Sequence, residues 1–158
     1  MGTGKTAVGQ ALAKKNKWQF VDLDDLIELG QKMRISDIFA QKGEAYFRKI
    51  EKLTLKEVAA QKKFVVACGG GIVIDPQNLK IMQATGKVIC LSASVDVILK
   101  RTAGVTHRPL LNVPDQKKQI DLLLKLRAHY YAQADKTIDT SGSSIKQVAA
   151  KIAKMLSK

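Results

Sequence analysis

The sequence predicts an α/β fold built around a parallel β-sheet, and three observations support this prediction. Short apolar runs alternate with amphipathic stretches along the 158 residues, which is the pattern of repeated strand–helix units. The run at 64–68 is apolar throughout, as expected of a strand buried on both faces. A glycine-rich segment at 2–4 leads directly into a helical stretch, an arrangement typical of α/β proteins that bind phosphate at a helix N-terminus.

The same patterns place the elements in order. We expect strands at 18–22, 64–68, 88–91 and 137–139, and long helices at 6–15, 44–61 and 115–134. Shorter helices are expected at 24–30, after Pro76, from Ser94 to about Arg101, and from Ser143 or Ser144 to 156, with a helical turn capped by Ser36. Residues 104–114 show no periodicity and are expected to form a loop. No linker or repeat interrupts the pattern, so we expect one domain over residues 1–158.

Composition excludes several classes of protein. The apolar content of 46% is that of a globular chain, and no apolar run approaches the roughly 20 residues that span a bilayer, so a cytoplasmic protein without membrane contact is expected. Cys68 and Cys90 lie in apolar runs and are expected to be buried free thiols. The net charge of +13 comes from scattered lysines, and aromatic residues make up only 5%. We therefore expect a solvated basic surface around an anion-binding cleft, not a nucleic-acid partner.

The first six residues match the last part of a phosphate-binding loop. Gly4, Lys5 and Thr6 occupy the final positions of the pattern G-x-x-x-x-G-K-[ST], whose first glycine would lie upstream of Met1. Gly2 and Gly4 allow the backbone amides to point at phosphate oxygens, Lys5 supplies positive charge, and Thr6 offers a hydroxyl to Mg²⁺. The pattern thus predicts a site for a nucleoside triphosphate. The alternative is a glycine-rich N-cap of an ordinary helix.

Other segments carry polar groups that suit phosphoryl transfer. Asp22 and Asp24 follow a strand, and alternation would point both carboxylates at one site, where one acid can support Mg²⁺ and the other can take a proton from a hydroxyl. Helix-capping acids are the alternative interpretation. Three glycines at 69–71 follow a buried strand and indicate close approach of the backbone to a ligand. Arg108, before a rigid proline, is either part of an exposed connection or an arginine on a lid that closes over the nucleotide.

Taken in order, these segments resemble the shikimate kinase family over essentially the whole chain. The resemblance rests on MGTGKT at 1–6, FVDLD at 20–24, IF at 38–39, GEAYFRKIE at 43–51, GGG at 69–71, RPLL at 108–111 and LR at 126–127. It implies a P-loop kinase fold of the nucleoside-monophosphate-kinase-like branch, a three-layer sandwich with a parallel sheet. It also implies ATP-dependent phosphorylation of the 3-hydroxyl of shikimate, in the chorismate pathway to aromatic amino acids, by a monomeric enzyme that uses Mg²⁺.

The resemblance further implies roles for individual residues. The acceptor-binding segment is expected at about 24–52 and the lid at about 103–115. The catalytic residues are Lys5, Asp24 and Arg108, and Thr6 and Asp22 hold the metal. The nucleotide contacts are Gly2, Thr3, Gly4, Lys5, Thr6, Arg101 and Arg108. The shikimate contacts are Asp24, Phe39, Phe47, Arg48, Glu51, Gly69, Gly70, Gly71 and Arg127.

One feature departs from the family pattern. The strand that precedes the phosphate-binding loop in this fold lies between the strands at 64–68 and 88–91, and the chain as given lacks it. Its loss would leave unpaired backbone groups at about 1–3 kcal/mol each, so we expect the native protein to begin upstream of Met1. A chain without the strand is expected to bind ATP weakly or not at all. The alternatives are another small-molecule kinase of the fold, such as a gluconate-type kinase, or a non-catalytic P-loop remnant.

Overall fold

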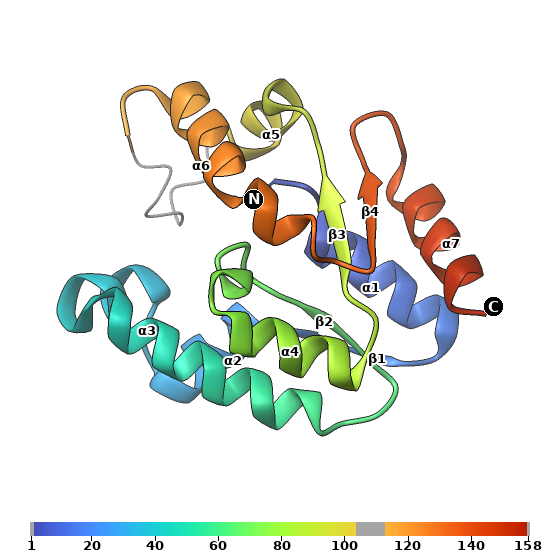
Figure 1. Ribbon diagram of the computed structural model, residues 1–158, viewed down its shortest axis with the longest axis horizontal. Helices are drawn as coiled ribbons and strands as arrows, with labels where there is room; N and C mark the ends of the chain where they lie inside the picture. The colour runs from blue at the N-terminus through green and yellow to red at the C-terminus, as the bar shows by residue number, and fades with distance from the viewer. Residues whose placement is uncertain (1, 104–112, 158) are drawn as a thin grey trace.

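The computed structural model describes residues 2–103 and 113–157. Helices and strands alternate along the chain as predicted (Figure 1). Their bounds are α1 Lys5–Asn16, β1 Gln19–Asp22, α2 Leu23–Gln31, α3 Ile35–Ala59, β2 Phe64–Ala67, the 3₁₀ helix η1 Ile72–Ile74, α4 Pro76–Thr85, β3 Ile89–Ser92, α5 Val95–Thr102, α6 Gln116–Tyr131, β4 Lys136–Asp139 and α7 Ile145–Leu156.

All strand pairs in the described residues are parallel, but they form two sheets instead of one. β1 pairs with β2, with Gln19 opposite Phe64, and β3 pairs with β4, with Ile89 opposite Lys136. The prediction of parallel pairing is confirmed, whereas the single continuous sheet is not seen in this part of the chain.

A cavity of about 820 Å³ separates the two sheets. Every residue of β2 and β3 lines it, so the edges of these two strands that face each other are not paired by any described strand. Apolar residues of α1, α3, α4, α6 and α7 cover its sides, including Leu12, Val58 and Leu79. The sequence analysis expected a strand to be missing between the strands at 64–68 and 88–91, and the two sheets are separated at this place.

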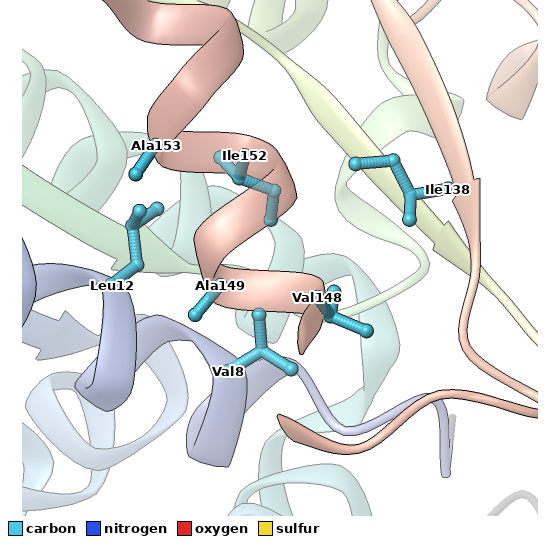
Figure 2. Close-up of a cluster of buried hydrophobic side chains, with 7 residues drawn as sticks. All are labelled: Val8, Leu12, Ile138, Val148, Ala149, Ile152 and Ala153. Atoms are coloured by element: carbon cyan, nitrogen blue, oxygen red, sulfur yellow. The ribbon is translucent and has the colours of Figure 1, made fainter. Parts of the chain in front are cut away.

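One helical layer is formed by α1 and α7, which pack together beside β4. Figure 2 shows their shared core, in which side chains from α1, β4 and α7 point toward one another. Its buried members are Val8, Leu12, Ile138, Val148, Ala149, Ile152 and Ala153. Gly9 brings α1 close to β1, since a Cβ there would lie 2.6 Å from the ring of Phe20. This packing fixes α1, and with it the loop that precedes α1.

The other layer holds α2, α3 and α4, which gather beside β1 and β2 in Figure 1. Leu23, Leu55, Val58 and Ile72 form one buried cluster, and Ile27, Ile38 and Phe47 form a second one under the first half of α3. Inside α3 the backbone breaks at Gly43, whose φ of 81° and ψ of 168° are not helical. The break separates the predicted turn near Ser36 from the predicted helix at 44–61.

Some predicted helix ends are wrong. Ser36 does not cap its helix, because Arg34 is the N-cap and Glu28 accepts the hydrogen bond from the amide of Ile35 at 2.9 Å. Asp22 caps α2, so the helix begins at Leu23, one residue before the predicted start. Of the two serines proposed as the cap of the last helix, Ser144 is the one that forms the capping box, with Gln147.

In the ranges 2–103 and 113–157, the structure contains no helix with the length and apolarity needed to cross a membrane.

Candidate active site

The loop before α1 has the backbone shape of an anion-binding site. Gly2 and Gly4 have φ angles of 59° and 88°, a region that glycine enters without strain, and Gly4 is the N-cap of α1. Within residues 2–103 and 113–157 no side chain caps this N-terminus by a hydrogen bond, and the partial positive charge of a helix N-terminus favours an anion. The loop leans on α5, where a Cβ on Gly2 would lie 3.0 Å from the methyl group of Thr102.

Asp22 connects the loop to the carboxyl end of β1. Its Oδ2 accepts a hydrogen bond from the hydroxyl of Thr6 at 2.9 Å, and its Oδ1 accepts one from the amide of Asp24 at 3.1 Å. The capping interpretation of Asp22 is therefore correct, and the same residue also contacts Thr6. Two oxygen donors of this kind, a hydroxyl and a carboxylate, suit Mg²⁺. Among the described residues there is no group of three or more His, Cys, Asp or Glu side chains that could hold a metal.

Asp24 lies in the first turn of α2, not in the strand, so the predicted strand alternation does not explain its direction. It nevertheless lies close to Asp22 and Lys5, as the charges around it show. Burial raises the pKa of the Asp24 carboxyl above 3.8, Asp22 raises it further, and Lys5 opposes the rise. A carboxylate with a raised pKa beside a cation is suited to accept a proton in a reaction.

Arg48 and Glu51 form a partly buried ion pair on α3. The Nη1 atom of Arg48 lies 2.7 Å from Oε2 of Glu51, whose side chain is 1% exposed, and Nη2 lies 3.1 Å from Oε1 of Glu44. Burial raises the pKa of Glu51, although Arg48 and Arg127 pull it down and Asp24 raises it. Burial alone would lower the pKa of Arg48, but its hydrogen bonds with Glu51 and Glu44 raise it. Oε1 of Glu51 is buried without a hydrogen-bond partner among the described residues.

The glycine segment 69–71 lies against these side chains. A Cβ on Gly69 would come within 3.4 Å of both Asp24 Oδ1 and Glu51 Oε1. A Cβ on Gly71 would lie 2.5 Å from Nη2 of Arg48, so the Arg48 guanidinium would have to move away from its present position. The backbone at Gly71 therefore lies close to the Arg48 guanidinium, and the predicted close approach of this segment to a ligand stays a prediction.

Arg127 reaches the same place from α6. The sequence left open which face of this helix it occupies, and the structure buries it, at 8% exposure, close enough to Glu51 to lower the pKa of that carboxyl. Two aromatic rings border the pair on α3: the centroids of Phe39 and Phe47 are 4.8 Å apart, and the guanidinium of Arg48 lies 5.2 Å from the Phe47 centroid.

Arg101, on α5, contacts the phosphate-binding loop at Gly2. It donates to the hydroxyl and the carbonyl oxygen of Thr140 at 3.0 and 2.9 Å, and to the carbonyl oxygen of Gly2 at 3.4 Å. The Thr140 hydroxyl also lies 3.1 Å from the carbonyl oxygen of Thr3. Helix α5, through Arg101, and the turn after β4, through Thr140, therefore both contact the backbone of the loop at Gly2 and Thr3. Arg108 lies outside the described residues.

The structure thus brings most of the predicted residues together. The charge of Lys5 lowers the pKa of Asp24, and the charge of Asp24 raises the pKa of Glu51. The charges of Arg48 and Arg127 lower the pKa of Glu51. Sequence reasoning missed Glu44, the support from Thr140, and Tyr131, whose hydroxyl donates to the carbonyl oxygen of Gly70 at 2.9 Å. A signal for Tyr131 existed, because it follows Arg127 by four residues and so shares its helix face.

A phosphate-binding loop next to a cluster of one aspartate and two arginines is typical of one class of protein, the P-loop kinases that act on a small anionic acceptor. Comparison with known proteins narrows this class. The family model described as "Shikimate kinase" matches residues 1–157. The shikimate kinase of Thermodesulfovibrio yellowstonii is 44% identical over 154 residues, which cover 98% of this chain and 89% of that protein.

Solved structures agree with the sequence matches. A shikimate kinase from Acinetobacter baumannii in complex with shikimate has a TM-score of 0.95 at 35% identity, covering 99% of this chain and 88% of that one. Shikimate kinase from Bacteroides thetaiotaomicron has a TM-score of 0.89 at 31% identity, covering 100% of this chain and 94% of that one. This chain belongs to the shikimate kinase family, and it has the P-loop kinase fold that the sequence predicted.

Proposed function

We propose that this chain transfers the γ-phosphoryl group of ATP to the 3-hydroxyl of shikimate, with the phosphates held at the loop 2–6 and the acceptor held between α2, α3, the glycine segment and α6. The observation that carries the proposal is the convergence of Asp24, the Arg48–Glu51 pair and buried Arg127 next to the phosphate-binding loop. Membership of the shikimate kinase family supports the same reaction.

The loop and α1 would bind the triphosphate. Backbone amides around Gly4 and the N-terminus of α1 face the anion, and Lys5 adds a positive charge that also acts on Asp24. Thr6 and Asp22, hydrogen-bonded at 2.9 Å, are the residues we assign to Mg²⁺. When bound, the ion would neutralise charge on the phosphate oxygens.

Two arginines suit the carboxylate of the acceptor. A guanidinium can pair with a carboxylate through two parallel hydrogen bonds, and Arg48 and Arg127 both adjoin Glu51. Glu51 would hold Arg48 in place while Gly71 leaves room for its guanidinium. Phe39 and Phe47 would form the apolar side of the pocket.

Asp24 would orient the reacting hydroxyl and accept its proton. As the hydroxyl oxygen bonds to the γ-phosphorus, the bond from the γ-phosphorus to the bridging oxygen of ATP breaks, ADP leaves, and the hydroxyl proton passes to the Asp24 carboxylate. The raised pKa of Asp24 favours this acceptance. Arg108, outside the described residues, would close over the transferred group, and Arg101 would contact the adenine.

We further propose that the protein acts as a monomer in the cytoplasm and has no nucleic-acid partner. Scattered lysines, not a continuous basic run, support the last point.

A coupled assay of ADP release tests the function. Wild-type protein with Mg²⁺·ATP should turn over with shikimate and not with gluconate or nucleoside monophosphates. The variant Arg127→Ala should lose at least about tenfold in kcat/KM for shikimate, because a charged contact to a carboxylate contributes about 1.5–3 kcal/mol. Lys49→Ala, which removes an exposed cation from α3, is the matched control and should match wild type. Turnover of another acceptor that survives Arg127→Ala would favour a different kinase, and no turnover with ATP at all would favour a non-catalytic remnant.

A further inference from the structure

Tyr131, at the end of α6, ties that helix to the glycine segment. Its hydroxyl donates a hydrogen bond of 2.9 Å to the carbonyl oxygen of Gly70, which is 61 positions away in the sequence. We propose that Tyr131 is a positioning residue for the acceptor: it sets where the segment 69–71 lies relative to the arginines and Asp24. This inference rests on the proposed function, since it assigns a role within the same pocket.

The position of the glycine segment decides how much room the pocket has. Its backbone already lies so close to Arg48 that a Cβ on Gly71 would overlap the guanidinium, and a Cβ on Gly69 would touch Asp24 and Glu51. A shift of a few tenths of an ångström would therefore change the space between these side chains. The carbonyl oxygens of Gly69 and Gly71 accept hydrogen bonds from the amides of Ile72 and Ile74 at 3.2 and 3.1 Å, within the same turn. The carbonyl oxygen of Gly70 is instead held by a side chain from another element.

Tyr131 is well placed to provide that contact. It follows Arg127 by one helical turn on α6, and Arg127 is buried beside Glu51. The contacts of α6 run chiefly to α5 and to η1, the 3₁₀ helix directly after the glycines. The hydrogen bond from Tyr131 thus joins α6, which carries Arg127, to the glycine segment, whose backbone lies next to Arg48.

One further hydrogen bond joins the end of α6 to the same layer. Nε2 of Gln83 on α4 donates to the carbonyl oxygen of Gln133 at 2.9 Å. The acceptor Gln133 lies just beyond the end of α6, and this hydrogen bond is exposed. It gives a comparison in which a tether is removed without touching the glycine segment.

The test is Tyr131→Phe, which removes the hydroxyl and keeps the ring. A neutral hydrogen bond contributes about 0.5–1.5 kcal/mol, so we expect the KM and the calorimetric Kd for shikimate to rise about two- to tenfold. The KM for ATP and kcat should stay within about twofold of wild type, because the hydroxyl contacts no group at the phosphate-binding loop in the described structure.

Two matched controls separate positioning from general stability. Tyr130→Phe makes the same change at the preceding residue, whose side chain forms no hydrogen bond with residues 2–103 or 113–157, and Gln83→Ala removes the exposed tether. Both should leave the shikimate Kd unchanged.

Three results would overturn the inference: an unchanged shikimate Kd in Tyr131→Phe, equal losses for shikimate and ATP, or the same loss in Gln83→Ala. Wild-type protein that binds no shikimate would instead remove the proposed function, and this inference with it. If wild-type protein binds shikimate and Tyr131→Phe binds it with the same Kd, the proposed function stands and only this inference is wrong.

Discussion

At the scale of single residues, Asp24 combines a functional position with an energetic cost. Burial and the neighbouring Asp22 disfavour its charged form and raise its pKa above 3.8. A carboxyl whose pKa is higher in the folded state binds protons on folding, so stability falls as pH rises through the interval between the two pKa values. The charge needed for proton transfer is therefore destabilising at neutral pH.

Asp24→Asn should separate these two effects. We expect kcat to fall by about 10²-fold or more, because the general base is lost, and the melting temperature at pH 7 to rise above that of wild type. The rise should shrink as pH falls toward the ordinary aspartate value, where both side chains are neutral. Calorimetry from about pH 4 to 8 measures this. A variant that is less stable than wild type at pH 7 would contradict the assignment.

The Arg48–Glu51 pair makes the opposite contribution. Glu51 is 1% exposed and pairs with Arg48 at 2.7 Å, so Arg48→Met should leave the buried carboxylate with only Arg127 as a cationic neighbour among the residues described here, and cost about 3 kcal/mol of unfolding free energy. Adding Glu51→Gln should recover part of the loss, since it removes the uncompensated charge. Urea unfolding of the single and double variants at pH 7 provides the measurement. A double variant that is less stable than Arg48→Met would show that the pair does not act as a unit.

At the scale of elements, capping decides where helices begin, and the sequence showed this only in part. Ser144 was one of two candidate caps, and the Gln147 three residues later is the signal that favours it. At α3, by contrast, the predicted cap Ser36 lost to Glu28, because a side chain from the preceding helix takes the amide of Ile35. No local pattern reveals a cap that comes from another element.

The last helix allows a clean test of capping. Ser144→Ala removes the side chain that accepts from the amide of Gln147, and the loss of such a cap costs about 1 kcal/mol, or about 2–4 °C in melting temperature for a chain of this size. Ser143→Ala is the matched control and should shift the melting temperature by much less. Equal shifts in the two variants would mean that the capping box does not stabilise α7.

The candidate site shows the same division between local and tertiary information. The phosphate-binding loop, the glycine segment and the arginines carried local signals that the sequence analysis used. The direction of Arg127 and the hydrogen bond of Tyr131 depend on how α6 lies against η1. The spacing of four residues shows only that these two side chains share a helix face. Asp24 lies close to Asp22 and Lys5, but the geometrical reason that the sequence offered for this was wrong, since Asp24 belongs to α2 and not to β1.

At the scale of the whole molecule, both cysteines lie between the two sheets, and burial changes the acidity of their thiols. Cys68 and Cys90 both line it. Burial, and then the charges of Glu51 and Asp24, raise the pKa of the Cys68 thiol to about 12. Burial also raises the pKa of Cys90. The prediction of free thiols is confirmed, although both are only partly buried by exposure.

Cysteine labelling tests this environment. At pH 8 the thiolate content of Cys68 should be about a thousandth of that of an ordinary cysteine, because the thiolate fraction falls tenfold for each unit by which the pKa exceeds the pH. We expect iodoacetamide to modify Cys90 faster than Cys68 in the native protein, and both at equal rates in urea, as followed by peptide mass spectrometry. Faster modification of Cys68 would contradict the apolar surroundings of its thiol.

The net charge of +13 acts on stability and on ligand binding with opposite signs. Like charges spread over one small domain repel each other in the compact state, and they attract an anion such as ATP. Raising NaCl from about 0.02 to 0.3 M shortens the Debye length from about 20 to about 6 Å, so both effects should weaken.

We expect the melting temperature to rise with NaCl while the KM for Mg²⁺·ATP increases several-fold. Calorimetry and the coupled assay in the same buffers provide the measurements. A melting temperature that falls with NaCl would mean that specific ion pairs, such as Arg48–Glu51 and Lys52–Asp75, outweigh the repulsion among the scattered lysines.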